Sequence, residues 1–122
     1  MSWETENALN YLNYWGKARP PNGEGEPYHL LPYHCLDVAA VAYAFVGRHP
    51  SFRQHLMVAT KIETEEGLLA WLAFWVALHD LGKFSEAFQG QRSDLFAALR
   101  GREPRAAKSY RLRHDSLGML FW

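Results

Sequence analysis

The sequence lacks the features of a secreted protein and of a membrane protein, and it has no excess of charge of one sign. It contains one cysteine, Cys35, in 122 residues, so no disulfide bond can form within the chain and a reducing compartment is favoured. Lys and Arg number 13, as do Asp and Glu, which excludes the whole-chain basic excess typical of nucleic-acid binders. No signal-peptide pattern opens the chain, and no apolar run approaches the ~18 residues of a membrane span. We therefore expect a cytoplasmic protein with no membrane contact.

The alternation of apolar and polar residues that marks β-strands is almost absent too. Apolar residues instead recur at intervals of three and four, which predicts an all-α fold in a single domain over residues 1–122. A loop rich in Gly and Pro interrupts the pattern at residues 19–27. A basic stretch over residues 100–113 is also predicted to be a loop. The expected helices cover residues 3–15, 32–46, 51–61, 65–81, 85–89, 93–99 and 114 onward.

The helix expected at residues 65–81 has the clearest signals. Thr64 can cap its N-terminus, and Glu65 and Glu66 favour the positive end of the helix dipole. Its body is apolar on all sides, which predicts a central, buried helix. Gly82 is the natural residue to follow its last turn, which places the pair His79 and Asp80 in that turn.

Three of the six histidines share a helical stripe with apolar residues. His34 aligns with Val38, Val41 and Phe45, and His79 and His114 align with apolar residues of their own helices. An unpaired imidazole in a core costs roughly 1 to 3 kcal/mol, so each needs a hydrogen-bond partner or a metal. A satisfied core histidine explains any one of them, but three together, one beside an acid, favour a shared site. The loop histidines at positions 29, 49 and 55 are not expected to bind metal.

An imidazole beside a carboxylate is a ligand set for a transition metal. The donors of His34, His79, His114 and Asp80 suit Mn, Fe, Co, Ni or Zn rather than Ca, and the sequence does not select among them. Lys83 follows Asp80 by one turn, where its ammonium can neutralise a phosphate, although a solvated lysine near a helix end explains it equally well. His114-Asp115 is a second His-Asp pair, and we expect Asp115 to be dispensable for metal binding.

Several ordered motifs resemble the N-terminal HD nuclease domain of type I CRISPR-associated nuclease-helicases. The His-Asp-x-Gly-Lys motif alone is common to the whole HD superfamily. The helix run from His34 to Ala42 and the early Trp-Gly-Lys are more specific. The motifs are Tyr14-Trp15-Gly16-Lys17, the run from His29 to Ala42, Leu78-His79-Asp80-Leu81-Gly82-Lys83-Phe84, Phe88-Gln89, and Arg113-His114-Asp115-Ser116.

The resemblance implies an HD-domain-like helical bundle that holds divalent ions and hydrolyses single-stranded DNA. Matched residue by residue, His34, His79, Asp80 and His114 are the implied metal ligands, and Asp80 and Lys83 the implied catalytic groups. The metal is Mn, Fe, Co, Ni, Mg or Zn. The implied partners are a helicase that feeds the DNA strand and a crRNA-guided surveillance complex that recruits the enzyme.

The chain departs from the family pattern at its end. The family's later His-His pair and distal Asp have no counterpart, and no Walker motif is present, so we expect the N-terminal part of the domain without a helicase. The last helix has no stop signal before Trp122, so we expect the natural domain to continue, with the helicase in missing sequence or another chain. Catalytic activity is left open. The alternatives are an HD phosphohydrolase acting on nucleotides and a non-catalytic form that binds the surveillance complex or another partner.

Overall fold

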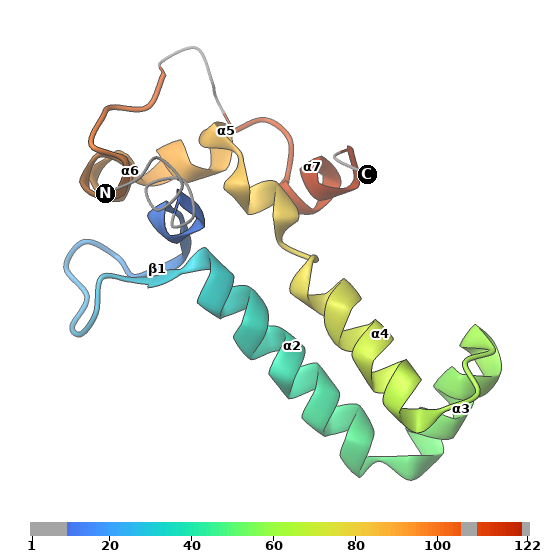
Figure 1. Ribbon diagram of the computed structural model, residues 1–122. Coiled ribbons are helices and arrows are strands. Elements are labelled where there is room, and N and C mark those ends of the chain that lie inside the picture. Colours follow the sequence, from blue (N-terminus) through green and yellow to red (C-terminus); the bar gives the residue numbers. More distant parts are fainter. Residues whose placement is uncertain (1–9, 106–109, 121–122) are drawn as a thin grey trace, which may run out of the picture. The chain divides into compact units, whose positions relative to one another are not determined.

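The computed structural model describes residues 10–105 and 110–120, and most of these residues are helical, which confirms the all-α class (Figure 1). The chain divides into two compact units. The first comprises the described parts of Met1–His34 and Asp80–Trp122, and the second is Cys35–His79. Among the described residues, none of the helices is both long and apolar enough to cross a membrane.

The second unit contains three helices, most of α2 (Leu31–Arg48), then α3 (Pro50–Thr60) and α4 (Glu65–Ala77). All three lie close to the predicted ranges. Pro50 occupies the first turn of α3, where its missing N–H costs nothing. The Thr64 side chain accepts a hydrogen bond from the Gly67 backbone N–H at 3.1 Å, as predicted for the cap of α4. In Figure 1 the chain runs along α2, turns through α3 and returns along α4.

The prediction that this apolar helix is central is wrong in the described structure. Leu68 is the buried residue of α4, whereas the exposed fractions of Trp71, Phe74 and Trp75 are 44%, 54% and 43%. On α2, Val41 and Phe45 are also more than half exposed, so the stripe shared with His34 is not a buried one. The reason is that the three helices of this unit offer more apolar surface than they cover among themselves.

The first unit begins with a short 3₁₀ helix, η1 (Asn10–Asn13), and a hairpin of β1 (Trp15–Ala18) and β2 (Tyr28–Leu30). The strands are antiparallel, with Lys17 opposite His29 and Ala18 opposite Tyr28. The expected loop at residues 19–27 joins them. The helix predicted over residues 3–15 is met in part: Asn10–Asn13 is a 3₁₀ helix, but Trp15 is in a strand, and residues 1–9 lie outside the described residues.

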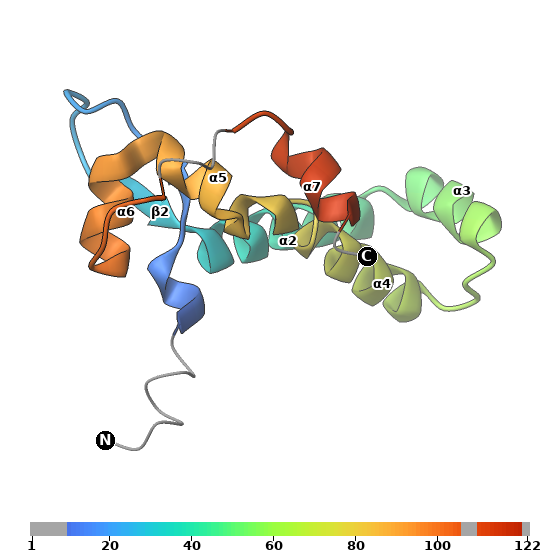
Figure 2. The same cartoon turned by 90° about the horizontal axis from the view of Figure 1, so that it is seen from above.

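The remaining elements of the first unit follow residue 80. They are η2 (Leu81–Phe84), α5 (Glu86–Gln89), η3 (Gly90–Arg92), α6 (Ser93–Arg100) and α7 (His114–Leu120). Both views show α7 beside the η2 segment (Figures 1 and 2). A small core of Trp15, Phe88 and Leu95 joins β1 to α5 and α6, and the Trp15 and Phe88 ring centroids are 4.7 Å apart. This core fixes the hairpin against the segment that carries Asp80.

Candidate metal centre

The Asp80 carboxylate is the point at which the predicted site residues meet. Asp80 is 2% exposed and lies in the turn that precedes η2. Its Oδ2 lies 2.9 Å from His34 Nε2 and 2.7 Å from Lys83 Nζ, and its Oδ1 lies 3.3 Å from His114 Nε2. Three side chains that the sequence separates by up to 80 positions thus converge on one buried carboxylate.

His34 reaches this point because β1 passes very close to the start of α2. A Cβ on Gly16 would lie 2.8 Å from Leu31 Cα and 3.0 Å from His34 Cβ, closer than any larger residue allows. The Leu31 N–H donates to the Tyr14 carbonyl oxygen at 2.8 Å, which holds the first turn of α2 against this strand. Gly16, a member of the Trp-Gly-Lys motif, is therefore required by the packing around His34.

Lys83 is held inside the site and is not a solvated lysine. Its side chain is 13% exposed, and its ammonium donates to the Gly16 carbonyl oxygen at 3.3 Å as well as to Asp80. The ammonium also lies 5.6 Å from the centroid of the Phe88 ring, a cation–π distance. These contacts fix a positive charge beside the Asp80 carboxylate.

A buried glutamine connects the strand to the HD segment. Gln89 is 1% exposed, and its side-chain amide accepts from the Trp15 N–H at 3.1 Å and donates to the Trp15 carbonyl oxygen at 2.8 Å. The same amide nitrogen donates to the Lys83 carbonyl oxygen at 2.8 Å. The indole N–H of Trp15 donates in turn to the Gln89 carbonyl oxygen at 3.1 Å. Because the groups of Trp15 and Gln89 are buried, the loss of the Gln89 side chain would leave the Trp15 backbone N–H and carbonyl unpaired.

His114 is placed by a close backbone contact and by a tyrosine. A Cβ on Gly82 would lie 1.7 Å from the His114 carbonyl oxygen, so the first turn of α7 touches the η2 backbone directly. The Tyr110 hydroxyl accepts from the His114 backbone N–H at 2.8 Å and lies 3.0 Å from His114 Nδ1. The ring therefore presents Nε2 toward Asp80.

His79 lies after the end of α4 and not in its last turn, so its predicted position in the core is wrong. The helix ends at Ala77 with Leu78 as its cap, and the His79 side chain is exposed. Its Nδ1 donates to the Val76 carbonyl oxygen, which leaves Nε2 as the nitrogen that carries a lone pair. Such a bond from the other ring nitrogen is the usual way in which proteins orient a ligating imidazole.

The donor set fits a divalent cation. His34, His79 and Asp80 each offer one ligand atom, and these atoms all lie within 4.8 Å of one another. Two atoms bonded to one cation at about 2.1 Å each lie at most about 4.2 Å apart, so the side chains would have to move closer together to complete the set. Two imidazole nitrogens and a carboxylate oxygen suit a transition metal. His114 is not in this group, but it contacts the other oxygen of the same carboxylate.

The second His-Asp pair has a different environment. Asp115 is exposed and accepts from the Arg113 guanidinium at 3.2 Å and from the Ser116 N–H at 2.7 Å. The Arg113 hydrogen bond is the main cause that holds the pKa of this carboxyl below its usual value. Asp115 thus belongs to the helix end and to a surface pair, and not to the cluster around Asp80.

Part of the basic stretch is also paired within the chain. Both Arg102 guanidinium nitrogens lie 3.1 Å from the Glu86 carboxylate oxygens, and the Arg105 N–H donates to Glu86 at 2.8 Å. These hydrogen bonds, that of Arg102 first, lower the pKa of Glu86 to about 2. Glu86 therefore stays ionised at neutral pH and ties this stretch to α5.

Sequence reasoning missed the supporting residues. Trp15, Gly16 and Gln89 are members of the motifs but had no predicted role, and neither had Tyr110. For Trp15, Gly16 and Gln89 the signal was their place in motifs on both sides of the His-Asp pair, whereas Tyr110 lies in none of the motifs. Sequence reasoning also set aside His29, whose ring centroid lies 6.5 Å from that of His34.

We predict that Tyr110→Phe weakens metal binding without unfolding the protein. The change removes the hydroxyl that orients His114 but keeps the ring contact with Phe88, whose centroid is 5.7 Å away. Loss of such an orienting partner lowers metal affinity by about 10-fold. Titration calorimetry with Mn measures the change, and Tyr43→Phe on α2 is the control. Equal affinities for wild type and Tyr110→Phe would show that the hydroxyl does not position His114.

An all-α domain in which a His-Asp pair meets a helix-borne histidine is an HD-like domain. This chain belongs to the family described as the Cas3 HD domain, whose model matches residues 15–122.

Two curated relatives support this membership. The chain is 37% identical over 92 residues to the CRISPR-associated endonuclease/helicase Cas3 of Escherichia coli strain K12, which covers 75% of this chain and 10% of that protein. It is 44% identical over 78 residues to the Thermus thermophilus protein of the same name, which covers 64% of this chain and 8% of that protein. The chain thus spans about a tenth of the length of these relatives. No solved structure gave a significant match.

Proposed function

We propose that the chain is a metal-dependent HD-type nuclease domain that degrades single-stranded DNA in CRISPR interference. The observation that carries the proposal is the buried Asp80 carboxylate, shared by His34, Lys83 and His114, in a member of the Cas3 HD domain family. An acid that is 2% exposed and surrounded by imidazoles is the environment expected of a metal ligand.

The residues of the cluster divide into cation ligands, a phosphate contact and orienting groups in this proposal. His34, His79, Asp80 and His114 hold the cation, which supplies Lewis-acid activation of a phosphodiester when it is bound. The Lys83 ammonium lies 2.7 Å from Asp80 and provides a positive charge for a nonbridging phosphate oxygen. The Val76 carbonyl and the Tyr110 hydroxyl orient the two histidines at the ends of the cluster.

The names of the relatives support two proposed partners. Because both are CRISPR-associated endonuclease/helicases, we propose that a helicase, in further sequence or in another chain, supplies the single strand. We also propose that a crRNA-guided surveillance complex recruits the enzyme, in the cytoplasm. The location and both partners remain predictions.

The decisive experiment offers the protein single-stranded DNA and deoxynucleoside triphosphates side by side. We expect Mn-dependent cleavage of the DNA, which chelation stops, and slower or no hydrolysis of the nucleotides. Hydrolysis of nucleotides alone would favour the phosphohydrolase alternative. Metal binding without turnover of either substrate would favour the non-catalytic form.

A further inference from the structure

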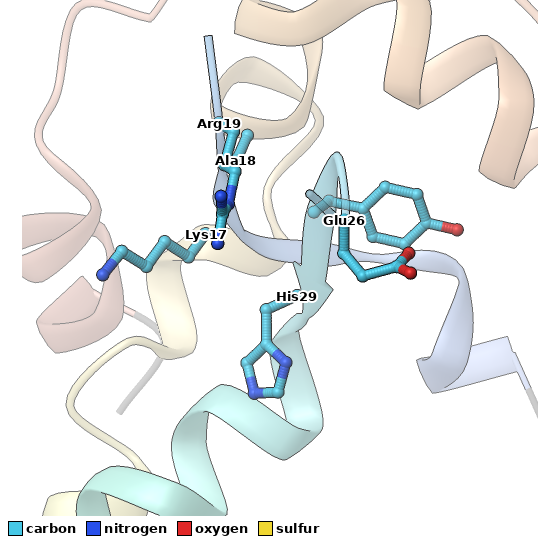
Figure 3. Close-up of a pocket in the computed structure, with 6 residues that line it drawn as sticks. Lys17, Ala18, Arg19, Glu26 and His29 are labelled. Carbon is cyan, nitrogen blue, oxygen red and sulfur yellow. The ribbon is translucent and has the colours of Figure 1, made fainter. Parts of the chain in front are cut away.

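A pocket lies on the β1–β2 hairpin, within the same compact unit as Asp80. It has a volume of about 520 Å³ and is lined by Lys17, Ala18, Arg19, Glu26, Tyr28 and His29 (Figure 3). This volume is in the range that small-molecule and nucleotide sites occupy. The lining contains two permanent cations and one carboxylate, so it favours an anionic ligand.

The strand register assigns these residues to two faces. Lys17 is opposite His29, and cross-strand partners project from the same face of a hairpin. Ala18 and Tyr28, the next pair, pack against the core of Trp15, Phe88 and Leu95. Lys17 and His29 therefore project away from that core.

The face of Lys17 and His29 adjoins the candidate metal centre. The His29 and His34 ring centroids are 6.5 Å apart, with the rings nearly perpendicular. Gly16, the residue before Lys17, accepts from the Lys83 ammonium through its carbonyl oxygen. A strand whose phosphate lies at Asp80 and Lys83 thus has its neighbouring nucleotides close to this face.

Lys17 is the cation best placed to meet that strand. The Arg19 guanidinium donates to the Glu24 carbonyl oxygen, which commits it to the loop of the hairpin. In Figure 3 the Lys17 and Glu26 side chains extend in opposite directions from the hairpin, so the carboxylate does not lie over the ammonium. Lys17 is exposed, as a phosphate contact requires.

We infer that the Lys17 and His29 face of the β1–β2 hairpin, at the edge of this pocket, is a subsite for a phosphodiester of the single DNA strand next to the one that is cut, with Lys17 as its cation and His29 beside it. This inference rests on the proposed function, because it names where the same substrate continues beyond the metal centre. It gives a role to the lysine of the Trp-Gly-Lys motif, which the metal cluster does not use.

The test measures binding of single-stranded oligothymidylate under chelation, so that neither metal nor cleavage contributes. The variants are Lys17→Gln, Lys17→Arg and, as a control of equal charge change, Arg48→Gln at the exposed end of α2. We expect Lys17→Gln to reduce the slope of log affinity against log salt by about 0.7, the value of one phosphate contact to a single strand. Lys17→Arg should restore the slope, and Arg48→Gln should not change it.

Further results decide the outcome. Mn affinity should be the same for Lys17→Gln and wild type, since Lys17 is not a ligand. Equal slopes for Lys17→Gln and wild type, equal losses for Lys17→Gln and Arg48→Gln, or no DNA binding by wild type would overturn the inference. Loss of thymidine monophosphate binding with no change in DNA binding would show that the pocket takes a free nucleotide instead.

Cleavage separates failure of the subsite from failure of the proposed function. If wild type cuts DNA while the slopes are equal, the subsite alone fails. If it binds DNA through Lys17 but does not cut, the proposed function fails.

Discussion

Replacement of Asp80 by Asn should abolish divalent-metal binding. The substitution keeps the shape of the side chain but removes the charge that His34, Lys83 and His114 approach within 3.3 Å. Removal of a residue that merely supports a ligand lowers affinity by roughly 10–100-fold, so loss of a ligand that contacts two imidazoles should exceed that. Titration calorimetry with Mn measures the loss, and DNA cleavage should disappear with it.

Asp115→Asn is the matched control for this prediction. It alters the second His-Asp pair in the same way, but Asp115 is exposed and bonded to Arg113 and Ser116. We expect wild-type Mn affinity for this variant. Circular dichroism must show that both variants are folded, since Asp80→Asn also removes the counter-ion of Lys83. Equal losses in the two variants would mean that the metal, if it binds, is not held at Asp80.

The sequence predicted the helices more reliably than their burial. The ranges for α2, α3, α5 and α6 and the start of α4 were nearly correct because Pro and Thr at helix starts and Gly near helix ends act locally, whereas α4 ends at Ala77, before the predicted last turn. Burial depends on what covers a helix, which periodicity does not encode. Trp71 and Phe74 therefore looked like core residues and are exposed. For Lys83 the sequence left a solvated and a site position equally open, and its side chain is 13% exposed beside Asp80.

In the candidate site, too, local patterns indicated some residues but not the tertiary contacts that place them. The apolar-stripe pattern selected His34, which does contact Asp80 although Val41 and Phe45 of that stripe are exposed. His79 was expected in the core and lies exposed in a turn after Ala77. The contacts of Gln89 with Trp15 join residues 74 positions apart, and no local pattern announces such a pairing. These buried amide contacts also explain why Trp15 forms a strand where periodicity predicted a helix, since tertiary context overrides weak local preference.

Gly82→Ala should both destabilise the fold and weaken the metal centre. The new methyl group would lie 1.7 Å from the His114 carbonyl oxygen and 2.9 Å from the Gly118 backbone nitrogen, so α7 must move away. We expect a loss of about 3 kcal/mol in unfolding free energy, the upper end of the usual cost of overpacking. At the size of this chain that corresponds to a fall of roughly 10 °C in melting temperature. Calorimetric melting measures it.

Gly118→Ala is the control from the other side of the same contact. Its Cβ would lie 3.4 Å from the Gly82 nitrogen and 3.8 Å from Leu81 Cβ, which are van der Waals distances. Alanine also favours a helix over glycine by about 1 kcal/mol. Stability should therefore be unchanged or slightly higher. Equal destabilisation by the two substitutions would indicate that η2 and α7 do not touch in this way.

The effect of Gly82 on the metal centre should act through His114 alone. We expect the methyl group to act only by displacing the His114 imidazole from Asp80 Oδ1. In that case it cannot lower the Mn affinity of a protein that already lacks this imidazole. Gly82→Ala should then reduce Mn affinity in wild type but not in a His114→Ala background. Such non-additivity is the signature of two residues in one interaction. Additive losses would place the effect elsewhere, in Asp80 or Lys83 on the η2 segment itself.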